Sequence, residues 1–74
     1  MLRLARMKFS SMLNRIVNYP GEIAYRSSWP ENVWLSVGMH GKQQCLLYHD
    51  DISTWPYSVQ QADLFASDWR TEDG

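Results

Sequence analysis

The sequence predicts an α+β fold, in which a small antiparallel sheet has an N-terminal helix and a short C-terminal helix packed on it. Apolar residues follow a helical period near the N-terminus and alternate with period two in the middle of the chain. A second helical pattern precedes residue 69, and the strand connections are too short for parallel crossovers. With 74 residues, the chain is expected to form one domain, residues 1–74.

The first helix is predicted to begin at Phe9. Apolar side chains recur on one helical face at Phe9, Met12, Leu13, Ile16 and Val17. The helix is expected to end at "NYPG", because Pro20 disfavours the helical conformation in the residue before it and Gly21 permits a turn. Residues 1–6 are expected to be either an added helical turn or a loose N-terminal extension.

Three segments with strand patterns follow this helix. They are "EIAYR" at 22–26, "VWLSV" at 33–37 and "QQCLLYH" at 43–49. The composition of "SSWPEN" is typical of a turn or loop, and "GMHGK" is expected to be a glycine-flanked hairpin connection. These pieces together form the predicted antiparallel meander.

The last part of the chain is predicted to be a loop, "DDISTWPYS", followed by a short helix. Ser58 and Gln61 have the spacing of a capping box, in which each side chain bonds the backbone of the other residue. A weak apolar stripe continues the helix at Val59, Ala62, Phe65 and Ala66. The residues from Trp69 are a candidate for one more strand, with Trp69 as an anchor for the helix and Asp63 and Asp68 in structural roles.

The composition favours a small intracellular protein that associates with itself. Cys45 is the only cysteine, so no internal disulfide can form, and a lone thiol fits a reducing cytoplasm. A chain of this length buries a thin core. Four Trp, four Tyr and two Phe are more aromatic residues than that core can hold, so some are expected at a subunit interface or a ligand site.

The charges are balanced overall but unequal between the two ends. Residues 1–26 are mainly basic and residues 43–74 mainly acidic, which suits subunit contacts or a local pocket for an anion. The balance is too even for a general DNA or RNA surface. No segment has the length and apolarity of a membrane span or a signal peptide, which indicates a cytosolic protein without membrane contact.

No catalytic set is evident. Cys45 and His49 would lie about 13 Å apart along a strand, too far for a nucleophile and its base. "HDD" at 49–51 has the side chains of a metal site but no second cluster, so a solvated turn is the better interpretation. We therefore predict a protein that is not an enzyme and that has no metal and no cofactor.

One set of residues is a candidate for ligand binding. Arginine clamps phosphate oxygens, aromatic rings stack on bases, and helix N-termini favour anions. These residue types occur beside predicted turns and helix starts, at Phe9, Ser10, Arg26, Trp29, Trp55, Tyr57 and Ser58. They predict a nucleotide-like ligand, and the alternative is ordinary packing with a surface arginine.

The order of these residues resembles a small phage and prophage family, the Thoeris anti-defence protein 2 family. The opening "MKFSSMLNRIVNYPGEIAYRSSW" is similar to the family's Met-x-Phe start, helix, glycine and Arg-x-x-Trp element. "ADLFASDW" is similar to its closing Asp-Leu-x-Ala-x-Asp-Trp. The resemblance spans residues 7–69.

The resemblance implies a non-catalytic homotetramer in the host bacterial cytoplasm. Such a protein sequesters the cyclic ADP-ribose isomer (glycocyclic ADP-ribose) made by a TIR-domain enzyme and keeps the Thoeris effector inactive. Some members also hold cyclic dinucleotides, the signals of CBASS defence. On this chain, Phe9 and Trp29 would then stack on adenine, and Arg26 and the helix cap at Ser58 would meet phosphate or ribose.

Two other functions are open from the sequence. The first is a protein-interaction module that inhibits a host protein through its aromatic surface. The second is a small nucleic-acid binder that uses the basic N-terminal stretch, and the charge balance favours it least.

Overall fold

The structure is a computed structural model that describes residues 6–74. A helix α1 (Phe9–Asn18) precedes four strands, a short helix α2 (Gln61–Leu64) and a last strand. The strands are β1 (Glu22–Arg26), β2 (Trp34–His40), β3 (Gln43–His49), β4 (Thr54–Pro56) and β5 (Trp69–Asp73). The predicted α+β fold is confirmed. Most of the predicted N-terminal extension, residues 1–5, lies outside the described residues.

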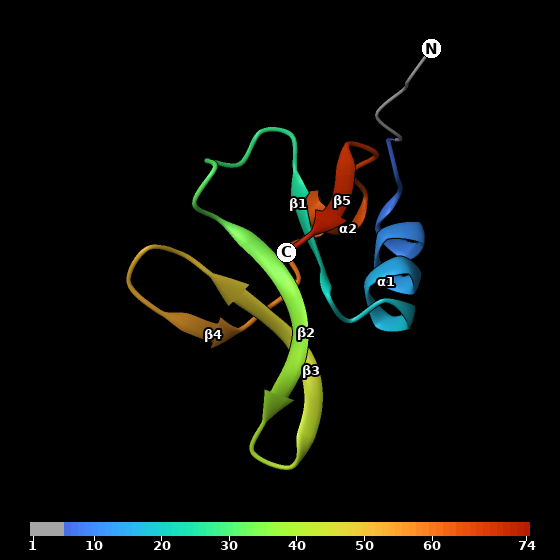
Figure 1. Ribbon diagram of the computed structural model, residues 1–74. Coiled ribbons are helices and arrows are strands. Elements are labelled where there is room, and N and C mark those ends of the chain that lie inside the picture. Colours follow the sequence, from blue (N-terminus) through green and yellow to red (C-terminus); the bar gives the residue numbers. More distant parts are fainter. Residues whose placement is uncertain (1–5) are drawn as a thin grey trace.

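The strands form one antiparallel sheet with the order β4-β3-β2-β1-β5. Strands β1 to β4 follow one another as a meander, and β5 returns to pair with the free edge of β1. The predicted strand from Trp69 is therefore confirmed, and it pairs with β1 over the full length of both strands. In Figure 1 the hairpin of β2 and β3 curves away from α1, while β1 and β5 lie beside the helix.

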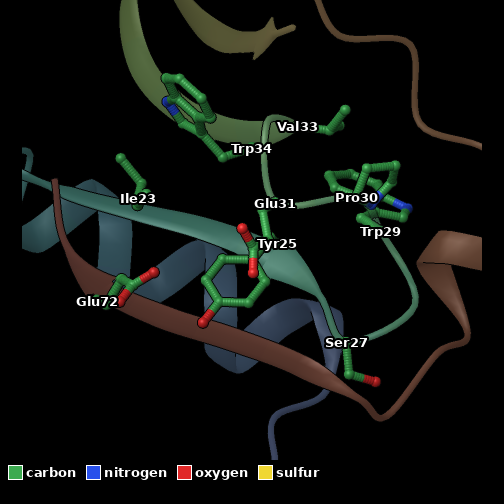
Figure 2. Close-up of a pocket in the computed structure, with 9 residues that line it drawn as sticks. All are labelled: Ile23, Tyr25, Ser27, Trp29, Pro30, Glu31, Val33, Trp34 and Glu72. Atoms are coloured by element: carbon green, nitrogen blue, oxygen red, sulfur yellow. The ribbon is translucent and has the colours of Figure 1, made fainter.

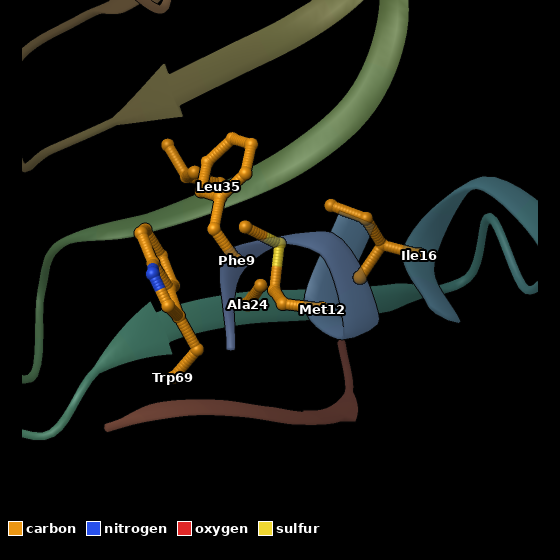
Figure 3. Close-up of a cluster of buried hydrophobic side chains, with 6 residues drawn as sticks. All are labelled: Phe9, Met12, Ile16, Ala24, Leu35 and Trp69. Atoms are coloured by element: carbon orange, nitrogen blue, oxygen red, sulfur yellow. The ribbon is translucent and has the colours of Figure 1, made fainter. Parts of the chain in front are cut away.

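The core lies between α1 and the sheet. Its buried side chains come from three positions on α1 and from β1, β2 and β5: Phe9, Met12, Ile16, Ala24, Leu35 and Trp69 (Figure 3). Burial of a side chain such as that of Ile16 contributes about 1.5–3 kcal/mol. Leu13 and Val17 belong to the predicted stripe, but Leu13 is half-buried and Val17 is exposed, so the helix buries a narrower face than its sequence indicates.

The predicted capping box at Ser58 is wrong. The helix begins three residues later, at Gln61, and its cap residue Gln60 makes no side-chain capping bond. The physical reason is strand pairing, because the backbone N–H of Tyr57 still donates to the carbonyl of Leu46 on β3 (2.8 Å). Ser58 therefore directly follows a residue that is still paired with the sheet, and the chain has to turn before a helix can start.

The segment "DDISTWPYS", predicted as a loop, contains the edge strand β4. Asp50 makes this possible, because its Oδ1 accepts hydrogen bonds from the backbone N–H groups of Ile52 and Ser53, both at 2.8 Å. Such a turn reverses the chain, so that Trp55 pairs with Tyr48. The predicted connection "GMHGK" is also shorter than expected, since β2 continues to His40 and only two residues separate it from β3.

Strand pairing places a row of residues on the face of the sheet that α1 covers. The register joins Thr71 to Ala24, Ala24 to Leu35, Leu35 to Tyr48, and Tyr48 to Trp55. Since α1 packs mainly on β1, β2 and β5, the far end of this row has no helix above it. That end, over β3 and β4, is where the candidate site lies.

Candidate functional site

Trp29 is the centre of an aromatic cluster beside the core. It lies in the loop after β1, where its backbone N–H donates to the carbonyl of Arg26 (3.0 Å). Its ring meets Trp69 edge-on at a centroid distance of 5.2 Å, Tyr48 at 5.9 Å and Tyr57 at 6.3 Å. Each such pair adds about 0.5–1.5 kcal/mol to the burial of the rings. The cluster thus joins the packed core to the uncovered part of the sheet.

A cavity of about 400 Å³ opens next to this cluster, and we call it the aromatic pocket. Its lining residues come from the loop after β1, from β3 and from the segment 55–63: Trp29, Tyr48, Trp55, Pro56, Tyr57, Ser58, Gln60 and Asp63. The rings of Tyr48 and Tyr57 are nearly parallel, with an interplanar angle of 9°. The side chain of Trp55 is largely exposed at the rim. Flat rings around a cavity of this size suit a planar ligand.

Asp63 lies in the wall of the aromatic pocket and is held by Arg26. The Nη1 of Arg26 donates to Asp63 Oδ1 at 3.0 Å, and its Nε donates to Asp68 Oδ1 at 2.9 Å. The hydroxyl of Ser27 also donates to Asp68, at 2.8 Å. Burial by itself would raise the pKa of Asp68, but the bonds from Arg26 and Ser27 outweigh it and lower the pKa. The predicted structural roles of both aspartates match these contacts.

Tyr57 completes this network. Its hydroxyl donates to Asp63 Oδ2. Burial of the hydroxyl raises the pKa of Tyr57 well above its usual value. The hydrogen bond with Asp63 and the negative charge of Asp63 raise this pKa further. The hydroxyl therefore stays protonated at neutral pH, and its proton is directed at the carboxylate. The position of the Tyr57 ring in the pocket wall is fixed by this bond.

A second cavity, the open-face pocket, lies on the opposite face of the sheet and has a volume of about 430 Å³ (Figure 2). Ile23, Tyr25 and Trp34 form its strand side, and the loop after β1 closes the other side. Glu31 and Glu72 are its charged lining residues. Two carboxylates, against one in the aromatic pocket, and no arginine or lysine among the described lining residues make this cavity the less favourable of the two for a phosphate-bearing ligand. We therefore centre the candidate site on the aromatic pocket.

His49 also lies on the face of the sheet away from α1. Its side chain contacts Trp34, Ser36 and Thr54. The ring stacks on Trp34 at 5.2 Å, and its nitrogens lie 2.6 Å from Ser36 Oγ and 3.2 Å from Thr54 Oγ1. Burial lowers the pKa of His49, so the imidazole is neutral at neutral pH. Cys45 lies four residues before His49 on β3, and it pairs with Gly38 of β2. Among the described residues, no group of His, Cys, Asp and Glu has the arrangement of a metal site.

Four of the seven predicted site residues meet in the aromatic pocket: Trp29, Trp55, Tyr57 and Ser58. Phe9 is 9% exposed and packs edge-on against Trp69 at 5.7 Å, and with Ser10 it borders a separate depression beside α2. Arg26 is behind the pocket wall, with two of its nitrogens bonded to aspartates.

Four residues line the aromatic pocket without having been predicted as site residues: Tyr48, Pro56, Gln60 and Asp63. Asp63 was assigned a structural role, and that role is what brings its carboxylate into the pocket wall. Tyr48 was recognisable only through its pairing with Trp55, and that pairing depends on a strand that the sequence did not reveal. Gln60, a polar residue three positions after Tyr57, gives no such signal by itself.

The fold and the pocket define a small α+β protein with an aromatic-walled cavity, which is its candidate binding site. Its sequence matches the family model of the Thoeris anti-defense 2-like domain over residues 7–71. The chain belongs to this family, which agrees with the resemblance noted in its motifs and associates it with Thoeris anti-defence. No curated protein and no solved structure matches the chain. Within residues 6–74, no helix is long and apolar enough to cross a membrane.

Proposed function

We propose that the protein is a phage anti-defence sponge. It binds cyclic ADP-ribose-type immune signals, glycocyclic ADP-ribose above all, in the bacterial cytoplasm and holds them without cleaving them. The Thoeris effector then stays inactive. The observation that carries this proposal is the aromatic pocket, in which Trp29, Trp55, Tyr57 and Ser58 line one cavity inside a chain of the Thoeris anti-defense 2-like family.

The affinity that a sponge needs implies more than one copy of the chain. Sequestration below an effector's threshold requires nanomolar binding, which corresponds to about −12 kcal/mol. Within the described residues, no arginine or lysine lines the aromatic pocket, although the ligand has two phosphates. A neighbouring copy supplies the missing wall and the cations in this proposal, and a homotetramer is the assembly that we expect.

Cyclic dinucleotides are the second class of ligand in the proposal. They share with cyclic ADP-ribose the purine base, the ribose and the paired phosphates. A protein that holds both would also blunt CBASS effectors.

The proposal is tested by titrating the purified protein with cyclic ADP-ribose isomers and cyclic dinucleotides in a calorimeter. We expect nanomolar binding of at least one isomer, and its recovery intact after the protein is denatured by heat. Trp55→Ala is expected to weaken binding by about fivefold to 150-fold, because base stacking on an aromatic ring contributes about 1–3 kcal/mol. Ile52→Ala is the matched control, since Ile52 is 93% exposed and does not line the pocket.

Two results would count against the sponge. One is no binding at micromolar ligand, and the other is recovery of a cleaved product. Trp29→Ala is a second variant with a larger expected loss of binding. Because Trp29 also packs on Trp69, its thermal unfolding has to be measured alongside.

A protein-interaction module is the second candidate function. The observation that favours it is a set of exposed apolar side chains outside the aromatic pocket, chiefly Phe65 and Ile52. An inhibitor of a host protein would show no thermal shift with any nucleotide and would co-purify with one host protein. Phe65→Ser would then abolish that co-purification.

A further inference from the structure

Asp63 places a negatively charged hydrogen-bond acceptor in the wall of the aromatic pocket. Within residues 6–74 it is the only charged residue that lines this cavity. Its side chain is 10% exposed, its Oδ1 accepts a hydrogen bond from Arg26, and its Oδ2 accepts one from Tyr57. A carboxylate offers about four acceptor positions, so two bonds leave capacity for a ligand. The wall at Asp63 is therefore an acceptor surface.

Arg26 decides which kind of donor this surface suits. The guanidinium bonds Asp63 at 3.0 Å and Asp68 at 2.9 Å, so one cation is shared by two carboxylates, and Arg26 does not itself line the pocket. A carboxylate that already bonds a cation does not require a cationic ligand, and a neutral N–H group can donate to a free acceptor position on it. A phosphate at this position would meet carboxylate oxygens that keep part of their negative charge, which disfavours it.

The shape of the cavity selects a planar donor. The rings of Trp29, Tyr48 and Tyr57 form its walls, and Trp55 stands at its rim. Asp63 is fixed from a third direction, because the indole N–H of the buried Trp69 donates to the Asp63 backbone carbonyl at 2.9 Å. The carboxylate is thus held in one place relative to the rings. A flat group that stacks on the rings presents its edge to the carboxylate.

We propose that Asp63 is the specificity-determining residue of the aromatic pocket and accepts a hydrogen bond from the exocyclic amino group of a stacked nucleobase. This inference rests on the proposed function and deepens it, because it assigns the base to this pocket and leaves the phosphates to a surface outside it. A site that hydrogen-bonds an amino group discriminates against an analogue that lacks it, because one hydrogen bond to a charged acceptor is then lost.

The test compares two ligands on the unchanged protein. Calorimetry is done with a cyclic ADP-ribose isomer and with the same isomer carrying unsubstituted purine in place of adenine. We expect the purine form to bind about tenfold more weakly or worse, because one hydrogen bond to a charged acceptor is lost. Equal affinities would overturn the inference and leave the sponge intact. Binding of neither ligand would overturn the sponge, and the inference with it.

A pair of variants separates Asp63 from its neighbours. In Asp63→Asn the single carbonyl oxygen is engaged by Arg26 and the NH₂ group replaces the second acceptor, so the preference for adenine is expected to fall to less than threefold. Asp68→Asn is the matched control, since Asp68 also binds Arg26 at 2.9 Å but does not line the pocket, and it should keep the preference. Retention of the full preference in a folded Asp63→Asn protein would overturn the assignment. If that variant does not fold, the two-ligand comparison still decides.

Discussion

Trp69 shows how much a single residue does in a chain of this size. Its side chain is fully buried, it packs edge-on against Phe9 and Trp29, and its indole N–H bonds the backbone of Asp63. Its backbone pairs with both Met7 and Arg26. One aromatic residue near the C-terminus therefore joins the N-terminal segment, the core and the pocket wall.

His49 is the residue from which we expect a visible pH effect on stability. Its pKa is lowered from the usual 6.5 by burial, so the folded protein holds the neutral ring. Below pH 6.5 the unfolded chain takes up a proton that the folded chain resists. Stability that is present above pH 6.5 is then lost as the pH falls toward the lowered pKa.

We predict that His49→Gln removes the first part of this acid destabilisation. The measurement is urea unfolding between pH 7.5 and pH 5, in which the wild type should lose stability as the pH falls and the variant should stay nearly constant. Gln is chosen because an amide can still bond Ser36 and Thr54. An identical decline in both proteins would show that another group carries the effect. The lowered pKa of Asp68 acts in the same direction, but only below the usual pKa of 3.8 and therefore outside this range.

Among the elements, the β2–β3 hairpin extends beyond the part of the sheet that α1 covers (Figure 1). Its turn contains Gly41, with φ = 65°. This left-handed conformation is strained for a residue with a Cβ by about 1–2 kcal/mol, whereas glycine and, to a lesser degree, asparagine adopt it readily.

We predict that Gly41→Ala destabilises the protein by about 1 kcal/mol and that Gly41→Asn costs less than half of that. Chemical denaturation measures both. Gly21→Ala is the control, because Gly21 has no positive φ and a Cβ there meets nothing within 4 Å. A destabilisation of the same size in Gly21→Ala would show that the strain at Gly41 is not the cause.

The short helix α2 depends on its surroundings more than on its own sequence. It has four residues and no side-chain cap, so it cannot be stable in isolation. The bonds of Asp63 to Arg26, Tyr57 and Trp69 hold it against the sheet. The same contacts that stabilise the element therefore shape the binding pocket.

At the scale of the whole molecule, one helix covers only part of a five-stranded sheet. Large apolar side chains outside the core are exposed, with Phe65 at 80% and Trp55 at 60%. A thin core and an uncovered sheet are the conditions under which small proteins gain stability from association.

We predict that the protein sediments as a multiple of its 8.7 kDa chain, and a tetramer is the form that the proposed function requires. Analytical ultracentrifugation over a hundredfold range of concentration measures this directly. The unfolding temperature should also rise with protein concentration, because association stabilises the folded state by mass action. An 8.7 kDa particle and a constant unfolding temperature at all concentrations would contradict the prediction.

Local patterns predicted most of the elements and named four of the eight residues that line the candidate pocket. The helix from Phe9, the strands at 22–26 and 43–49 and the strand from Trp69 follow from periodicity, because each buries one face against the same core. Strand β4 was missed because it has only three residues, all of them exposed, and it exists through pairing with β3. The helix start at Gln61 was missed for the same reason, since pairing at Tyr57 outweighs the capping sequence.

The sequence by itself determined the α+β class, the core face of α1 and the family, and it supplied the residue types of the candidate site. These depend on periodicity and on motif order, which are local properties. Only the tertiary structure decided that Trp29 and Tyr57 line one cavity while Phe9 belongs to the core, and that Arg26 is held by Asp63 and Asp68. The physical reason is that strand register and long-range ion pairs join residues about 40 positions apart, and no local pattern encodes which partners meet.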